Sequence, residues 1–282
     1  MLNCHGSPDL PAELYLDLLK KCVTRYIFPE AAEPLKWRTS GVIQRPLYGL
    51  VERFMARCGL CIMRRTRYQP AVREQGHDWP SEADTMIGLK RLDNLHECII
   101  NVLRDGVPGD LIETGVWRGG ATIFMRGALK AYGETSRTVW VADSFQGVAR
   151  PNAEQYPADY GDTLWTYSEL AVSLETVKAN FTKYGLLDDQ VKFLPGWFRD
   201  TLPGAPIHRL AVMRLDGDLY ESTMDSLSLL YPKLAVGGYT IIDDYGSMPP
   251  CRRAVDEFRL AHGISEELQA VDFDAVYWRR TR

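Results

Sequence analysis

Short apolar runs alternate with helix-like segments through the second half of the chain. The runs DLIETG, TVWVAD, VKFLPG, LAVMRLD and GGYTIIDD are strand-like, and each is followed by a helical pattern or a loop. This alternation is typical of a parallel sheet with crossover helices. The nearly continuous apolar character of 210–215 and 239–242 indicates strands covered on both faces. The pattern predicts an α/β domain.

Helical periodicity and a closing pair of strands complete this expectation. Apolar residues recur at helical spacing in 10–28, in 82–104 and from Leu219 onward. The chain closes with LQAVDF and AVYWRR, two adjacent strand-like runs that predict an antiparallel pair at the edge of the sheet. We therefore expect an N-terminal helical or lid region over 1–81 and the α/β domain over 82–282.

Composition narrows the class of protein without naming an activity. The 282 residues are 45% hydrophobic and 25% charged, with a formal net charge of −4, so nothing favours nucleic acid as a partner. The N-terminus lacks a basic and then apolar leader, and no run of 18 apolar residues occurs. We expect a cytoplasmic protein without membrane association. Only Cys58 and Cys61 have C-x-x-C spacing, and no second pair completes a zinc site.

Arginine is concentrated between residues 38 and 73, where only Glu52 opposes the positive charge. The arginines are Arg38, Arg45, Arg53, Arg57, Arg64, Arg65, Arg67 and Arg73. Three interpretations stay open: a solvated helix or oligomer contact, a lid that meets an anionic substrate, or a membrane-surface element. We expect a homo-oligomer.

A glycine-rich turn follows the first predicted strand, in ETGVWRGGATIF. Gly115, Gly119 and Gly120 permit a sharp turn, and the free N–H groups of the next helix point toward the same place. The dinucleotide fingerprint G-x-G-x-x-G is absent because Trp117 stands two residues after Gly115, which disfavours a nicotinamide cofactor. The remaining pattern is E-x-G-x-x-x-G, in which Glu113 can meet an amino group or a sulfonium. This arrangement is typical of Rossmann-like S-adenosylmethionine-dependent methyltransferases.

The ends of the next two strands fit the same kind of ligand. Asp143 lies 28 residues after Gly115, where one crossover should return the chain to the neighbouring strand. Its carboxylate can accept both hydroxyls of an adenosine ribose, or it can cap the following helix. Trp197 follows the third strand and offers a flat face to adenine, although it could equally belong to the core.

Four aspartates stand at the ends of two strands that should be neighbours. LDGDLY supplies Asp216 and Asp218, and IIDDY supplies Asp243 and Asp244. Clustered carboxylates repel one another and raise one another's pKa, whereas a hard divalent cation removes the repulsion. We expect Mg²⁺ at this edge. The alternative is that the aspartates cap helices or pair with arginines, namely Arg214, Arg252 and Arg253.

The chain resembles the macrocin O-methyltransferase family of actinobacterial antibiotic pathways, which methylates sugar hydroxyls on macrolides and related products. The resemblance covers about 85–282 and rests on TMIGLKRLDNL, GDLIETGVWRGGATIFMRG, VWVADSFQG, FTKYGLLDDQVKFLPGWFRDTLP, LDGDLY, GGYTIIDDY and VYWRR. It implies the class I methyltransferase fold, with a mostly parallel seven-stranded sheet and an antiparallel terminal strand.

The resemblance also implies roles for single residues. Mg²⁺ would be held by Asp216, Asp243 and Asp244 together with vicinal sugar hydroxyls, and Asp218 would be the general base. Residues implied around S-adenosylmethionine are Met86, Glu113, Gly115, Asp143, Ser144, Gln146 and Trp197.

The expected acceptor is the sugar of a glycosylated natural product. Two alternatives are enzymes that act on a nucleotide-diphosphate sugar or on a phenolic diol of the catechol type. Two others belong to different classes: a nicotinamide oxidoreductase, disfavoured by the glycine spacing, and a binding protein without chemistry, disfavoured by the four aspartates.

Overall fold

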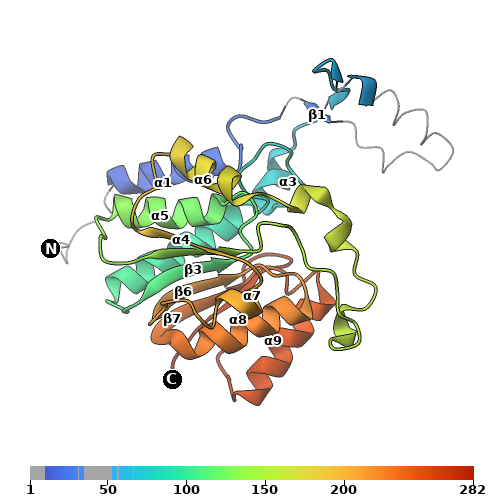
Figure 1. The fold of residues 1–282 in the computed structure, drawn as a ribbon. Coiled ribbons are helices and arrows are strands. Elements are labelled where there is room, and N and C mark those ends of the chain that lie inside the picture. Colours follow the sequence, from blue (N-terminus) through green and yellow to red (C-terminus); the bar gives the residue numbers. More distant parts are fainter. Residues whose placement is uncertain (1–9, 31, 35–52, 56, 66) are drawn as a thin grey trace.

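A seven-stranded sheet forms the centre of the molecule (Figure 1). The structure is a computed structural model that describes residues 10–30, 32–34, 53–55, 57–65 and 67–282. The sheet order is β5-β4-β3-β6-β7-β9-β8. Its strands are β3 (Asp110–Thr114), β4 (Val139–Asp143), β5 (Val191–Pro195), β6 (Leu210–Leu215), β7 (Leu234–Ile242), β8 (Gln269–Ala270) and β9 (Val276–Arg279).

Strands β3 to β7 are parallel, whereas β9 runs antiparallel to β7 and to β8. This confirms the expected mostly parallel sheet with an antiparallel end. From β3 the chain moves outward through β4 to β5 and then returns to place β6 on the other side of β3. Such a reversal opens a crevice at the carboxyl ends of the strands, where ligands bind in open α/β sheets.

Helices cover both faces of the sheet. In Figure 1, α1, α4, α5 and α6 lie on one side, and α7, α8 and α9 on the other. The helices are α1 (Leu10–Val23), α3 (Pro70–Gln75), α4 (Leu89–Arg104), α5 (Gly120–Ala131), α6 (Leu174–Lys183), α7 (Phe198–Thr201), α8 (Tyr220–Leu230) and α9 (Pro249–Ala261), with short 3-10 turns η3 (Pro157–Asp159), η4 (Leu164–Thr166), η5 (Ser168–Leu170) and η6 (Tyr231–Lys233). Strands β1 (Ala32–Pro34) and β2 (Met63–Arg65) form a separate antiparallel pair.

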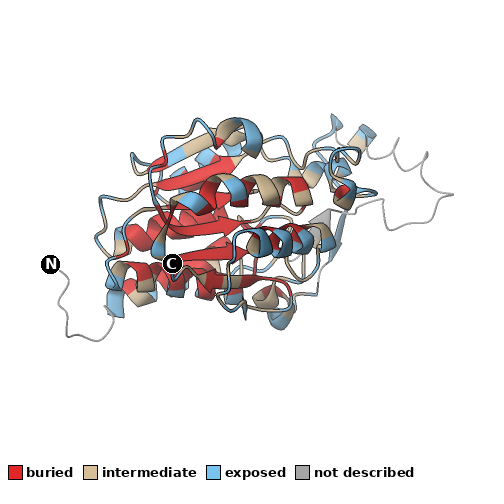
Figure 2. Ribbon diagram, turned by 90° about the horizontal axis from the view of Figure 1, so that it is seen from below, coloured by how far each residue is buried: buried red, intermediate tan, exposed pale blue. Residues whose placement is uncertain are grey.

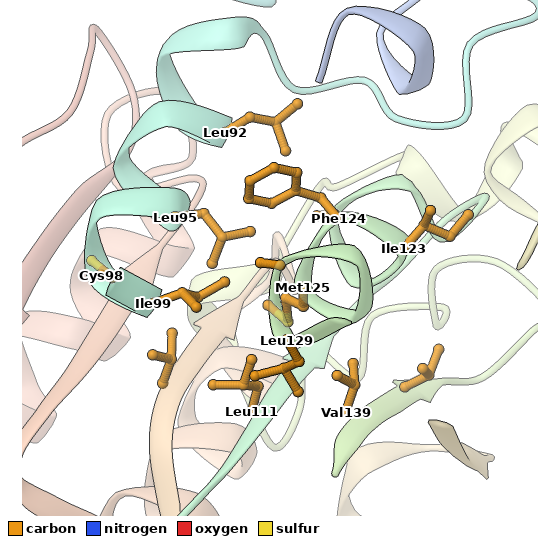
Figure 3. Close-up of a cluster of buried hydrophobic side chains, with 14 of the residues drawn as sticks. Leu92, Leu95, Cys98, Ile99, Leu111, Ile123, Phe124, Met125, Leu129 and Val139 are labelled. Carbon is orange, nitrogen blue, oxygen red and sulfur yellow. The ribbon is translucent and has the colours of Figure 1, made fainter. Parts of the chain in front are cut away.

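Each face of the sheet has its own apolar core, and the strands between them are buried (Figure 2). On one face Leu95 and Ile99 of α4 pack with Phe124 of α5 and Leu111 of β3 (Figure 3). On the other face Trp278 of β9 is fully buried in the second core. Two covered faces explain why the strands read as continuous apolar runs.

Both predicted helices before the sheet are shorter than their apolar patterns. The first, expected over 10–28, ends at Val23, and the chain turns at Arg25 with φ 54°. The second, expected over 82–104, begins only at Leu89. A buried arginine, Arg73, donates to the carbonyls of Met86 and Ile87 and holds them outside the helix. Met86 is therefore a loop residue.

The boundary predicted at residue 81 stays a prediction. Within 1–81, α1 packs on α5, and its Leu16 and Leu19 belong to the same core as Leu95. Among the described residues, no helix is both long and apolar enough to cross a bilayer.

The close approach of β3 and β6 gives a stability prediction. A Cβ at Gly115 (φ +83°) would lie 1.7 Å from the Asp216 carbonyl oxygen, whereas Gly133 (φ +67°) has open space around it. Gly133→Ala should lower the free energy of unfolding by about 1–2 kcal/mol through backbone strain alone. Gly115→Ala should lower it by about 3 kcal/mol or more, because two strand ends must also separate. Urea unfolding measures both, and equal losses would contradict the close contact.

Candidate active site

A cavity of about 630 Å³ opens at the carboxyl ends of the parallel strands. It is lined by the segments that follow β3, β4, β6 and β7 and by the loop before α4. Every residue predicted for the site lines it except Gln146. The chain turns at Phe145 (φ 56°), and Gln146 is exposed, with its backbone N–H donating to Ser144 Oγ.

The glycine loop joins β3 to α5 and is held in place by Asp143. One Asp143 carboxylate oxygen accepts from the N–H of Val116 at 2.8 Å, and the other accepts from the N–H of Phe145 at 2.7 Å. The next helical turn begins only at Pro157, so the alternative that Asp143 caps a following helix is wrong. Asp143 also lines the cavity, where it could meet a ligand. Its predicted contact with a ribose stays a prediction.

Glu113 is buried at the end of β3 and has only one of its two oxygens paired. Oε1 accepts from Arg214, whereas Oε2 has no partner among the residues that the structure describes. Burial raises the pKa of Glu113 to about 8, despite the Arg214 charge. A buried unpaired carboxylate oxygen is costly. Glu113 also lines the cavity, so its carboxyl group borders the space where a ligand would lie.

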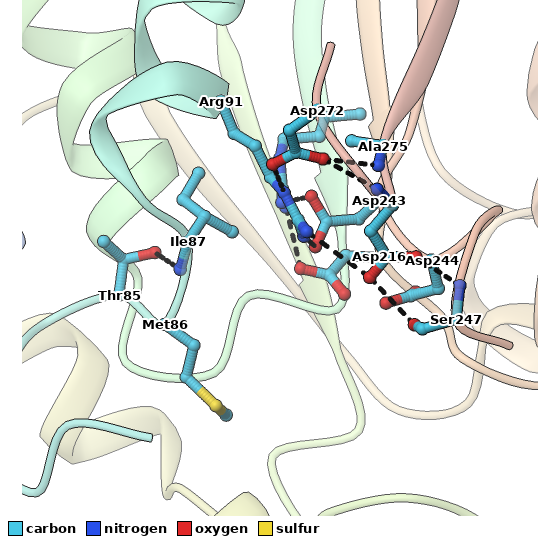
Figure 4. Close-up of polar contacts among 12 residues, drawn as sticks. Thr85, Met86, Ile87, Arg91, Asp216, Asp243, Asp244, Ser247, Asp272 and Ala275 are labelled. Carbon is cyan, nitrogen blue, oxygen red and sulfur yellow. Dashed lines mark hydrogen bonds and ion pairs between the residues drawn. The ribbon is translucent and has the colours of Figure 1, made fainter. Parts of the chain in front are cut away.

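Three aspartates that follow two neighbouring strands converge in the cavity (Figure 4). Asp216, Asp243 and Asp244 each offer one oxygen, and these oxygens all lie within 4.8 Å of one another. Asp218 adjoins them, because its backbone N–H donates to Asp244 Oδ2 at 3.1 Å. Oxygen ligands at this spacing suit a hard divalent cation.

Two buried arginines divide the aspartates into paired and unpaired groups. Arg214 contacts Asp243 and also Asp216, the latter at 2.9 Å, while Arg91 donates to Asp243 at 2.6 Å. No arginine contact to Asp244 is present among the described residues. The predicted alternative of arginine pairing therefore holds for Asp243 and in part for Asp216.

The other two arginines named in that alternative lie elsewhere. Arg252 donates to the carbonyls of Tyr245 and Gly246, and Arg253 pairs with Glu257.

The pKa values follow this division. Burial opposes ionisation of Asp243, but the guanidinium groups of Arg214 and Arg91 outweigh it and lower its pKa. Burial and the neighbouring carboxylates raise the pKa of Asp216 to about 6, that of Asp218 to about 8, and that of Asp244 well above its ordinary value. Asp218 and Asp244 thus lack a balancing arginine charge in the described part of the chain. Bound protons or a cation must balance their negative charge.

Sequence reasoning missed several parts of this cluster. Arg91 also donates to Asp272 at 2.7 Å and to Asp274 at 3.3 Å, in the loop between β8 and β9. No pattern in the sequence shows that Arg91, on an amphipathic helix, points inward. Arg214 was different, and it was one of the arginines named above as alternative partners of the aspartates. It is the single charged residue in the apolar run of β6, and a buried arginine needs carboxylate partners.

A second missed element is the strap, which we define as residues 147–171 between β4 and α6. The strap contributes Leu164 and Leu170 to the cavity wall. Asp159 of the strap accepts from the N–H groups of Tyr220 and Glu221, at the start of α8. The Trp117 indole N–H donates to the Glu169 carbonyl at 2.8 Å. The strap therefore covers the cavity from two anchors.

The arginine-rich segment contributes nothing described to the cavity. Arg38 and Arg45 lie outside the described residues, and none of the described arginines between 53 and 73 lines the cavity. Arg73 is buried and holds the loop at Met86. A lid role for this segment stays a prediction.

Comparisons of the sequence with known proteins show the family of this chain. The family model Macrocin-O-methyltransferase (TylF) matches residues 12–280. Mycinamicin III 3''-O-methyltransferase of Micromonospora griseorubida is 51% identical over 278 residues, covering 98% of this chain and 99% of that protein. The 8-demethyl-8-(2,3-dimethoxy-alpha-L-rhamnosyl)-tetracenomycin-C 4'-O-methyltransferase of Streptomyces olivaceus is 51% identical over 270 residues, covering 95% and 93%.

Solved structures agree as well. The O-methyltransferase NovP superposes with a TM-score of 0.83 at 49% identity, covering 96% of this chain and 100% of that chain. The fold is that of class I methyltransferases. With a family match over almost its whole length, the chain belongs to the macrocin O-methyltransferase family and is an O-methyltransferase.

Proposed function

We propose that this enzyme transfers a methyl group from S-adenosylmethionine to a sugar hydroxyl of a glycosylated antibiotic or related small molecule, with Mg²⁺ as an essential ion. One observation carries the proposal: Asp216, Asp243 and Asp244 line one cavity together with Glu113, and the three aspartates each offer an oxygen within 4.8 Å of the others. The relative named for 4'-O-methylation of a rhamnosyl tetracenomycin supports a sugar as acceptor.

The residues around the glycine loop fit S-adenosylmethionine, which supplies the electrophilic methyl group when bound. Glu113 lines the cavity, and its Oε2 has no donor in the described part of the chain, so this carboxyl group suits the cofactor's amino group. Gly115 leaves no room for a side chain, so the backbone itself forms this wall. Met86, Ser144 and Trp197 line the rest of this part of the cavity, together with Asp143.

The aspartate cluster fits Mg²⁺, which lowers the pKa of a coordinated hydroxyl when bound. Asp244 lacks an arginine partner among the described residues and has a raised pKa, so a divalent cation would relieve its repulsion with Asp218 and Asp216. Asp243 is oriented by Arg214 and Arg91. Three oxygen donors from the protein leave further coordination positions for acceptor hydroxyls.

Asp218 is the residue that we propose accepts the proton of the acceptor hydroxyl. It lines the cavity and has φ 59°, a conformation that non-glycine residues rarely adopt. The hydrogen bond from the Asp218 backbone N–H to the Asp244 carboxylate holds this turn next to the aspartate cluster. General-base help of this kind is worth roughly 10²–10⁴-fold in rate.

The charge of the cavity wall bears on the acceptor. Among the described lining residues the arginines are Arg91 and Arg199, and both are already paired with carboxylates. A diphosphate would meet an acidic wall without a free guanidinium. This balance favours an uncharged glycoside over a nucleotide-diphosphate sugar.

An acceptor panel tests the proposed function. With S-adenosylmethionine and Mg²⁺, methyl transfer to neutral glycosides such as mycinamicin III should exceed transfer to TDP-rhamnose by at least about tenfold in kcat/KM, because the acidic wall repels phosphate. Transfer to catechol should be weaker by a similar factor if the cavity is built for a sugar. Mass spectrometry of the products measures this. Preferred methylation of TDP-rhamnose or catechol would support an alternative acceptor instead.

Metal dependence is tested at Asp244. The buried arginines Arg91 and Arg214 bind Asp243, so they keep that partner when Asp244 is replaced. Asp244→Asn should abolish Mg²⁺ binding measured by calorimetry and reduce turnover at least about 10²-fold, since the ion both orients the acceptor and lowers its pKa. S-adenosylmethionine binding should be retained. Asp189→Asn, at an exposed acidic pair, is the matched control. Full activity of wild-type enzyme in EDTA would contradict a role for the ion.

The pH profile tests Asp218. A protonated carboxyl cannot act as a base, so kcat should fall as pH drops through the pKa of Asp218. That pKa is about 8 without an ion and should be lower with Mg²⁺ bound, because the cation favours the carboxylate. Asp218→Asn should lower kcat by about 10²–10⁴-fold and remove this acidic limb. An unchanged limb in the variant would assign the base elsewhere.

A further inference from the structure

Two aromatic rings on the cavity wall have no part in the mechanism. Trp79 is 49% exposed and Phe273 is 53% exposed, and both line the same cavity as the aspartates. Single exposed apolar side chains are common on protein surfaces, but two large rings that line one cavity offer apolar surface which a ligand can cover. Each ring therefore presents apolar surface to whatever enters the cavity beside the cofactor.

Neighbouring side chains hold both rings in place. The edge of Phe273 meets His77 with ring centroids 4.1 Å apart at 90°, and the Arg91 guanidinium lies 5.3 Å from its centroid. Trp79 meets Tyr167 of the strap with centroids 5.6 Å apart at 66°. Rings braced in this way form rigid apolar surfaces and lose little conformational freedom on binding a ligand.

Phe273 lies next to the reaction centre without being part of it. The residues on either side of it, Asp272 and Asp274, bind Arg91, which in turn orients Asp243. An acceptor whose hydroxyls reach the aspartates must therefore pass close to this ring. Hydroxyls match the carboxylates, whereas a flat apolar group matches the aromatic faces.

We propose that Trp79 and Phe273 determine acceptor specificity by receiving the apolar aglycone, while the attached sugar lies at the aspartates. The inference rests on the proposed function and assigns a further part of the same cavity. A sugar without an aglycone would leave both rings in water and gain nothing from them. The enzyme would then act after the sugar has been joined to its aglycone, on the product of a glycosyl transfer.

Two glycosides of one sugar test this directly. The probes are 1-naphthyl and methyl α-L-rhamnopyranoside, which differ only in the aglycone, and the measurement is the ratio of their kcat/KM values at saturating S-adenosylmethionine and Mg²⁺. Wild-type enzyme should prefer the naphthyl glycoside by at least about tenfold. Trp79→Ala and Phe273→Ala should each reduce that preference to about threefold or less. Trp79→Phe and Phe273→Leu, which keep apolar bulk, should give intermediate ratios.

Matched controls separate this role from a general effect. Trp165 is 43% exposed and Phe28 is 63% exposed, and neither lines the cavity, so Trp165→Ala and Phe28→Ala should keep the wild-type ratio. Calorimetry should show unchanged S-adenosylmethionine affinity in all variants. Wild-type enzyme without a preference, or Trp79 and Phe273 variants that keep it, would overturn the inference and leave the proposed function intact. If neither rhamnoside nor any glycoside of the acceptor panel is methylated, the proposed function fails and this inference with it.

Discussion

The geometry of the active site depends on one buried guanidinium. Arg214, the next-to-last residue of β6, is buried and contacts Glu113 of β3, Asp216 after β6 and Asp243 after β7. Three strand ends are thus tied to a single side chain. A buried ion pair contributes little net stability, because desolvation offsets the attraction, but removing one partner is severely destabilising. The network therefore serves chiefly to fix carboxylate positions, and Arg91 extends it to the loop between β8 and β9.

The same network leaves an imbalance that connects fold to chemistry. The two arginines hold Asp243 ionised, and the raised pKa values fall on Glu113, Asp218 and Asp244, which they reach only in part or not at all. A folded protein tolerates such groups by protonating them or by binding cations. The cavity thus combines a cluster of carboxyl groups, which suits a cation, with the apolar rings of Trp79 and Phe273.

The periodicity of the chain predicted the mostly parallel sheet, the pairing of β3 with β4 and of β6 with β7, and the aspartates at the strand ends, because buried strands and their carboxyl ends leave strong local patterns. It could not predict Arg91, Asp272 or Asp274, whose meeting depends on how α4 packs over the far edge of the sheet. The helix expected from residue 82 was wrong in its first turns for a similar reason. Arg73, distant from that pattern, captures the carbonyls that would otherwise begin the helix. Gln146 faces solvent because one residue, Phe145, adopts a positive φ. Side-chain contacts outside the helical pattern decided the first two cases, and a single backbone conformation decided the third.

The bond from Asp159 to the first N–H groups of α8 limits how this enzyme can diversify. Helix α8 has no capping side chain of its own at Leu219, so it borrows a carboxylate from a loop that also shapes the acceptor's surroundings. Evolution can exchange other parts of that loop to admit new acceptors. It must keep a side chain that accepts hydrogen bonds at this position, since otherwise the first N–H groups of α8, which begins two residues after Asp218, lose their partner. The cavity wall formed by the loop and the start of α8 are therefore coupled through a single residue.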